Sequence, residues 1–287
     1  MNIDFTLTAY RELLIAIKQS GYAFYTFEDW CDGNAHGRYV ILRHDVDLKA
    51  NNSLIIAGIE AEMGIRASYY FRIVPQSNQP DIIRSIAALG HEIGYHYEDL
   101  SLFQGDKGKA IEHFKVQLDY FRQFYPVRTV CMHGSPTSKW DNRDLWKSYN
   151  YRDYGITGEP YLDFLNNKPN EEPAMKYFTD TARMWDGGNY NLRDKQSGIS
   201  EQLSTGNKDI PEGNRNQPAL HQINASSLPR IHSTFDFMDW LKTEACPDII
   251  MITTHPQRWT DKPVDWFLEL LKQSIKNIIK RVIVRYS

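Results

Sequence analysis

The sequence predicts an α/β fold in which parallel strands and helices form a closed or nearly closed β/α barrel. Strand-like and helix-like stretches alternate along the chain, a rhythm typical of parallel sheets covered by helices. Several strand-like stretches are continuously apolar, as expected for strands that are buried on both faces. The length of 287 residues suits one such barrel, so we expect residues 1–287 to form a single domain.

The first element is a helix, because Tyr10, Leu13, Leu14 and Ile17 follow helical spacing and Gly21 is placed to end it. The next elements alternate between strand and helix, over 38–45, 51–64, 66–74, 80–90, 91–98 and 106–125. A strand in 127–136 and a helix near 142–149 follow, and the pattern then loosens between 153 and 188. It returns with a helix in 234–243, a strand in 248–255 and a last helix from 264 to about 283.

Residues 194–228 form a long polar insertion that is rich in Asn, Gln, Ser, Gly and Pro. A loop of this length is uncommon in a compact domain unless it is a functional flap or a disordered insertion. Both interpretations stay open: a flap near the site, or a dispensable surface insertion.

The composition argues against a nucleic-acid-binding protein and against a membrane-spanning one. With 24% charged and 41% hydrophobic residues and a net charge of −3, the chain has no electrostatic basis for binding nucleic acid. Its three cysteines are widely spaced, which favours a reducing compartment, and no run is long enough to span a bilayer. The N-terminus lacks a signal-peptide pattern, so we expect a cytoplasmic protein.

Polar side chains gather where the predicted strands end, which is where β/α barrels place their chemistry. Asp45 and Asp47 end one strand, His96 lies near the end of another, and His133 and His255 close two more. An alternating strand places Asp45 and Asp47 on one side, so the pair is either a metal ligand with a base or part of a salt-bridged loop. The four strand ends together favour the metal site.

Three motifs resemble the polysaccharide deacetylases, the NodB-homology family also classed as carbohydrate esterase family 4. "GHEIGYH" is similar to the second motif of that family, which contains a metal-binding histidine, and "RHDVD" lies where the family carries its Asp-Asp motif. "TTHPQRW" lies where the family places its catalytic histidine. The chain is most similar to the divergent "RHDVD" subgroup linked to bacterial surface-polysaccharide biosynthesis. The resemblance implies a distorted, NodB-like (β/α) barrel of about seven strands.

The resemblance also implies a role for each matching residue. Asp45 would be the general base, Asp47 and His96 would be metal ligands, and His255 would be the general acid. The implied cofactor is one divalent metal ion, Zn²⁺ first, with Fe²⁺ or Co²⁺ also compatible with mixed Asp and His ligation. Such an ion activates water and polarises the acyl oxygen, while the carboxylate and imidazole move protons.

The chain departs from the family at Leu100, where a second metal-binding histidine is usual. His133, Glu98 and Asp99 are the candidates for the third ligand, with His133 favoured. Arg43 is expected to balance the two aspartates and keep Asp45 ionised. The segment "TDTARMWDGG" resembles the fourth motif of the family, in which an acid and a tryptophan support the catalytic groups. The matching residues are Asp180, Trp185 and Asp186.

The implied reaction is hydrolysis of an N-acetyl or O-acetyl group on a sugar, a nucleotide-sugar or a lipid-linked glycan precursor. A catalytically inactive glycan-binding or scaffold protein on the same fold, and a hydrolase of another C–N bond, are the alternatives. The last helix carries apolar residues at helical spacing and several cations. We expect this helix to pack its apolar face against the barrel, and contact with an anionic membrane surface is the alternative.

Overall fold

The computed structural model describes residues 3–134, 138–165, 175–185, 231–243 and 246–286, with side chains up to residue 278. The predicted insertion at 194–228 and the candidate Asp186 lie outside these residues. No helix in the described part of the chain combines the length and the apolar character that crossing a bilayer requires.

All strand pairs run parallel, which confirms the predicted sheet type. The strands are β1 (Ala23–Tyr25), β2 (Tyr39–Val46), β3 (Ser68–Phe71), β4 (Glu92–Tyr97), β5 (Val130–Met132), β6 (Met175–Thr179) and β7 (Ile249–Thr254). Their order across the sheet is β5-β4-β3-β2-β7-β6, and β1 pairs with the first half of β2.

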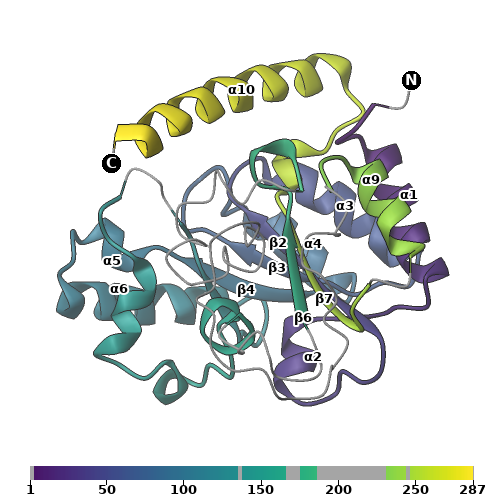
Figure 1. Ribbon diagram of the computed structural model, residues 1–287. Helices are drawn as coiled ribbons and strands as arrows, with labels where there is room; N and C mark the ends of the chain where they lie inside the picture. The colour runs from purple at the N-terminus through teal and green to yellow at the C-terminus, as the bar shows by residue number, and fades with distance from the viewer. Residues whose placement is uncertain (1–2, 135–137, 166–174, 186–230, 244–245, 287) are drawn as a thin grey trace, which may run out of the picture.

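The sheet curls into a half-barrel of six strands (Figure 1), with β5 and β6 at its two ends. We expected a closed or nearly closed barrel, but no pairing joins β5 to β6 among the described residues. The strand at Met175–Thr179 was missed from the sequence, in which that region follows no clear period. The half-barrel still directs the carboxyl ends of its parallel strands to one side.

Helices precede or follow most strands, as predicted. They are α1 (Leu7–Gln19), α2 (Phe27–Cys31), α3 (Ala50–Glu62), α4 (Pro80–Ala88), α5 (Asp99–Leu102), α6 (Lys107–Phe121), α9 (Thr234–Leu241) and α10 (Pro263–Tyr286). The expected helix near 142–149 is instead a short 3-10 turn over Asn142–Lys147, and another 3-10 turn, Thr181–Arg183, follows β6. Local capping explains several starts: Thr6 caps α1, and Ser233 with Asp236 forms a capping box on α9.

Gly94 explains part of the "GHEIGYH" motif. In β4 it lies beside Tyr70 of β3, which in turn lies beside Asp45 of β2. A Cβ at position 94 would be 2.3 Å from the ring of Tyr70, so only glycine lets this ring cross the strand. The close packing of Tyr70 on Gly94 therefore holds β3 and β4 together next to Asp45.

The last helix does not pack as expected. Helix α10 runs along one edge of the molecule (Figure 1), and its apolar residues remain largely exposed to solvent. Polar contacts hold it instead: Trp266 donates from Nε1 to the carbonyl of Asp4 at 2.7 Å, and Asn277 donates to the carbonyl of Ala182 at 3.2 Å.

Candidate metal and catalytic site

The structure brings the predicted residues together at the carboxyl ends of four strands. Asp45 lies in β2, and Asp47 follows that strand directly. His96 lies in β4, while His133 and His255 immediately follow β5 and β7. Strands β2, β4, β5 and β7 are parallel, so these five side chains converge although they are far apart in sequence.

Arg43 holds Asp45 through two hydrogen bonds. Its Nε donates to Oδ1 at 2.8 Å and its Nη2 donates to Oδ2 at 2.7 Å, and both side chains are almost fully buried. Burial alone would raise the pKa of Asp45, but Arg43 and then His96 outweigh it and hold this pKa well below its usual range. Asp45 is therefore an oriented, ionised carboxylate, as expected from the sequence.

His96 presents its Nε2 to both aspartates. Its Nδ1 lies 2.9 Å from the carbonyl oxygen of Cys131, which can only accept, so Nδ1 carries the proton and Nε2 keeps a lone pair. Nε2 is 3.8 Å from Oδ2 of Asp45 and 3.6 Å from Oδ1 of Asp47. Burial lowers the pKa of His96 to about 4, so the imidazole is neutral near pH 7, the form that binds a metal.

His133 is oriented by Glu98 in the same way. Its Nδ1 lies 2.8 Å from Oε2 of Glu98, and its Nε2 is 3.6 Å from Oδ1 of Asp47. Glu98 also accepts at Oε1 from Arg72 at 2.7 Å, so both of its carboxylate oxygens are engaged. Glu98 thus positions His133, and between these two candidates for the third ligand His133 faces the site.

His255 is oriented by Asp180. Its Nδ1 is 2.6 Å from Oδ1 of Asp180, and its Nε2 is 3.9 Å from Oδ2 of Asp47. Asp180 is fully buried and also accepts from Arg258 at 2.6 Å and from Nε1 of Trp259 at 2.9 Å. Burial would raise the pKa of Asp180, but Arg258 and His255 outweigh it and lower this pKa to about 2.

Asp47 lies at the centre of these three imidazoles. Its Oδ1 is buried and has no hydrogen-bond partner, although His96 and His133 each approach it to 3.6 Å. Two ligands that each lie about 2.1 Å from one ion are about 3.4 Å apart at the tetrahedral angle. The unpartnered Oδ1 therefore lies at a distance from each of the two Nε2 atoms that suits a pair of ligands on one divalent cation.

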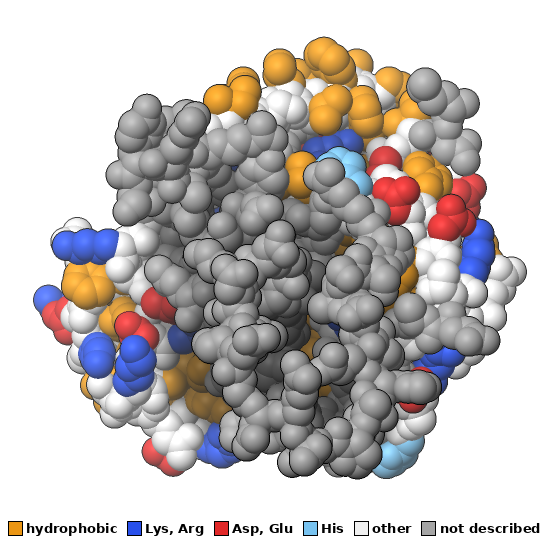
Figure 2. Space-filling model, in the orientation of Figure 1, with side chains coloured by type: hydrophobic (Ala, Val, Ile, Leu, Met, Phe, Trp, Pro, Cys, Tyr) orange, Lys and Arg blue, Asp and Glu red, His pale blue; other side chains and the backbone are white. Residues whose placement is uncertain are grey.

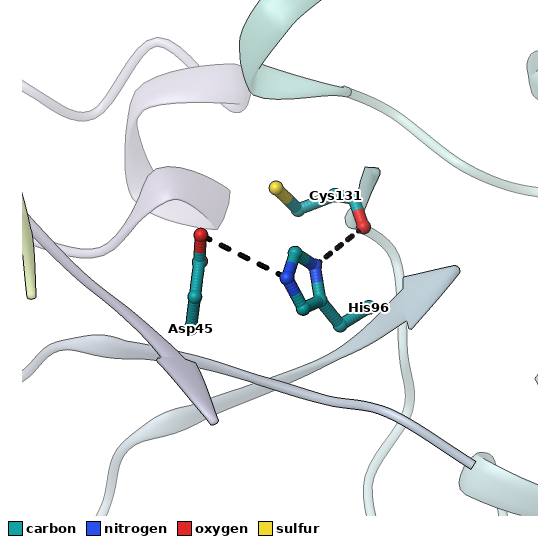
Figure 3. A group of neighbouring side chains, drawn as sticks. All are labelled: Asp45, His96 and Cys131. Atoms are coloured by element: carbon teal, nitrogen blue, oxygen red, sulfur yellow. Dashed lines mark hydrogen bonds and ion pairs between the residues drawn. The ribbon is translucent and has the colours of Figure 1, made fainter. Parts of the chain in front are cut away.

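A second set of possible ligands shares His96. Asp45, His96 and Cys131 (Figure 3) have ligand atoms that all lie within 4.8 Å of one another, the only group of at least three His, Cys, Asp and Glu residues with this spacing in the described part of the chain. Burial raises the pKa of the Cys131 thiol well above its usual range, so without a cation the sulfur stays protonated. A site on Asp47, His96 and His133 would instead require a small movement of at least one of these side chains.

The predicted residues Asp99 and Trp185 contact neither the two aspartates nor the three histidines through any hydrogen bond or ion pair described above. Asp99 turns to His113, at 2.5 Å, and to the hydroxyl of Tyr95, at 2.9 Å, so the structure places it in a separate buried cluster. Trp185 is buried, and its Nε1 donates to Thr234, so it packs in the core. Leu100, which stands where the resemblance would place a histidine, is also buried.

Two contributors were not identified as such from the sequence. Cys131 is one of the three widely spaced cysteines, and its separation of two residues from His133 is the signal in the sequence that places both on one side of a strand. Asp180 was named within a supporting motif, but its partner His255 is 75 residues away, and nothing in the sequence indicates that pairing.

Comparison of the chain with known protein families, with curated proteins and with solved structures found no match.

Proposed function

We propose that the chain is a metal-dependent hydrolase of the polysaccharide deacetylase type, built on a divergent NodB-like barrel, that removes an N-acetyl or O-acetyl group from a sugar. One observation carries the proposal. Three imidazoles with engaged Nδ1 atoms turn Nε2 toward Asp47, beside an aspartate that an arginine holds ionised. Structural ion pairs rarely leave a buried carboxylate oxygen unpartnered at the centre of such a group.

Asp47, His96 and His133 would hold the ion, with Zn²⁺, Fe²⁺ or Co²⁺ suited to this mixture of ligands. The unpartnered Oδ1 of Asp47 favours this set over Asp45, His96 and Cys131, because both oxygens of Asp45 already accept from Arg43. When bound, the ion would activate water and polarise the acyl oxygen. Hydrogen bonds from Nδ1 of both histidines to fixed acceptors would keep their rings in place.

Asp45 would accept the proton of the attacking water, and Arg43 would hold the carboxylate in position for that step. With Arg43 in this role, His133 would be available to bind the ion. His255 would donate a proton to the leaving nitrogen or oxygen. Asp180, ionised and bonded to Nδ1, would stabilise the imidazolium form that this donation requires.

The substrate class rests on the resemblance of the three motifs. An acetylated sugar, a nucleotide-sugar or a lipid-linked glycan precursor fits it, and another C–N bond is the alternative within hydrolases. One observation favours a glycan-binding protein without turnover: the buried Leu100 stands where the family has a metal-binding histidine. The two functions predict different results from the same assay.

The test measures acetate released from N-acetylated sugars offered free, as nucleotide-sugars and as lipid-linked sugars. We expect the wild type, loaded with metal, to release acetate, and Asp45→Asn to retain the metal but lose turnover. His96→Ala and Asp47→Ala should lose both, while His36→Ala, which changes an exposed histidine, should lose neither. Full activity in Asp45→Asn would disprove the role of Asp45 as the general base. Glycan binding by the wild type without release of acetate would favour the glycan-binding protein without turnover.

A further inference from the structure

Helix α10 exposes a continuous apolar face. Hydrophobic side chains gather along its outer side at the upper edge of the molecule (Figure 2), where each is between 45% and 70% exposed. They are Val264, Phe267, Leu268, Leu271, Ile275 and Ile278. The polar face of the same helix makes the contacts to the body, including those of Trp266 and Asn277 and an ion pair between Glu269 and Lys49 at 4.0 Å.

The spacing of this face is that of a coiled-coil seam. Val264, Leu268, Leu271, Ile275 and Ile278 are separated alternately by four and three residues, which is the a and d pattern of a heptad repeat. In the sequence, position 282 continues the series with another valine. A helix that packs on its own domain usually has its apolar stripe facing inward, whereas an a/d series facing outward, here flanked by Phe267, suits a partner helix.

The distribution of charge along α10 indicates which kind of partner covers its apolar face. Its first third carries only acids, Asp265 and Glu269, and the rest carries only cations, beginning with Lys272 and Lys276. A second copy lying antiparallel would place the acidic start of each helix toward the basic part of the other, while a parallel copy would align like charges. An anionic membrane would attract the basic part of the helix but repel its acidic start, so it accounts for only part of this charge pattern.

We propose that α10 pairs with α10 of a second copy of this chain as an antiparallel, two-stranded coiled coil around a twofold axis. The contact is isologous, because the same face serves both copies. It lies on the outer side of α10, away from the contacts of Trp266 and Asn277 with the body, so it adds an interface to the proposed function and does not depend on it.

Sedimentation velocity over a wide range of concentration tests the pairing. The wild type should be a dimer, and Leu271→Glu should be a monomer with unchanged circular dichroism. Val116→Glu is the control, because Val116 is an apolar residue on α6 that is at least as exposed as Leu271, 63% against 49%, and this variant should remain a dimer. A wild type that is monomeric at every concentration would overturn the proposal.

Charge reversal tests the orientation. Asp265→Lys should weaken the dimer about tenfold, because two symmetric attractions between the acidic start of one helix and the basic part of the other become repulsions, and Asp265→Asn should weaken it less. No change in either variant would contradict the antiparallel arrangement. A monomeric wild type that floats with phosphatidylglycerol vesicles, and no longer does so as Leu271→Glu, would identify a membrane as the occupant and also overturn the proposal.

Discussion

Replacing Arg43 with methionine should destabilise the fold strongly, because it leaves the carboxylate of Asp45 buried without its partner. The Arg43 side chain is fully buried and that of Asp45 is 7% exposed, and two hydrogen bonds of 2.7 and 2.8 Å join them. Breaking such a buried pair typically costs about 3–5 kcal/mol of unfolding free energy. Methionine fills much of the same volume, so loss of packing contributes less than the unpaired charge does.

The loss should be largely reversed when both charges are removed. In Arg43→Met with Asp45→Asn, no buried charge remains unpaired, and we expect stability within about 1–2 kcal/mol of the wild type. Urea unfolding followed by tryptophan fluorescence measures each value. The buffer should contain a chelator, since a cation that binds the folded site would add its own stabilisation.

Arg128 supplies a matched control. It holds Asp32 with a similar pair of hydrogen bonds, 2.8 and 2.6 Å, but at the surface, where the two side chains are 39% and 31% exposed. Arg128→Met should therefore cost at most about 1 kcal/mol. If the double variant at Arg43 and Asp45 is as unstable as Arg43→Met alone, the unpaired charge is not the cause and the account of this pair is wrong.

Three further outcomes follow from particular contacts. Gly94→Ala should lower the unfolding free energy by about 2–3 kcal/mol, since the new Cβ would lie 2.3 Å from the Tyr70 ring; an unchanged urea midpoint would contradict this. Burial raises the pKa of Glu92 to about 7 from an ordinary 4.5, so the wild type should lose unfolding free energy as pH rises between these two values. Glu92→Gln cannot ionise, so across this pH range its unfolding free energy should rise by about 3 kcal/mol relative to the wild type. Urea titrations at several pH values measure this difference, and parallel pH profiles of the two proteins would refute it. Asp180→Asn should lower kcat with little change in KM, because His255 loses the carboxylate on its Nδ1; an unchanged kcat would remove Asp180 from the proposed chemistry.

Much of the sheet could be predicted because several of its strands contain short runs of apolar residues and end in polar residues. The expected strands at 38–45, 91–98 and 248–255 correspond to β2, β4 and β7. The strands β1 and β6 were not predicted, because one has three residues and the other lies where no period is visible. The outward apolar face of α10 was also not predicted, since helical periodicity shows that a face is apolar but not what covers it.

The site was predictable where chemistry follows a strand end and unpredictable where it depends on contacts between distant segments. Asp45, His96, His133 and His255 were identified because each lies at or near the end of a strand-like stretch. The hydrogen bonds that orient these histidines join residues 35 to 75 positions apart, as in the pairs with Glu98 and Asp180, and only the folded sheet reveals them.

Metal content tests the central claim most directly. The protein should be purified without chelators or an affinity tag, loaded with Zn²⁺, Fe²⁺ or Co²⁺, and analysed by mass spectrometry beside His96→Ala, His133→Ala and Cys131→Ser. We expect about one bound ion per chain in the wild type and in Cys131→Ser, and none in the two histidine variants. Loss in Cys131→Ser with retention in His133→Ala would transfer the site to Asp45, His96 and Cys131. A wild type that binds no ion after loading would contradict the metal-dependent hydrolase.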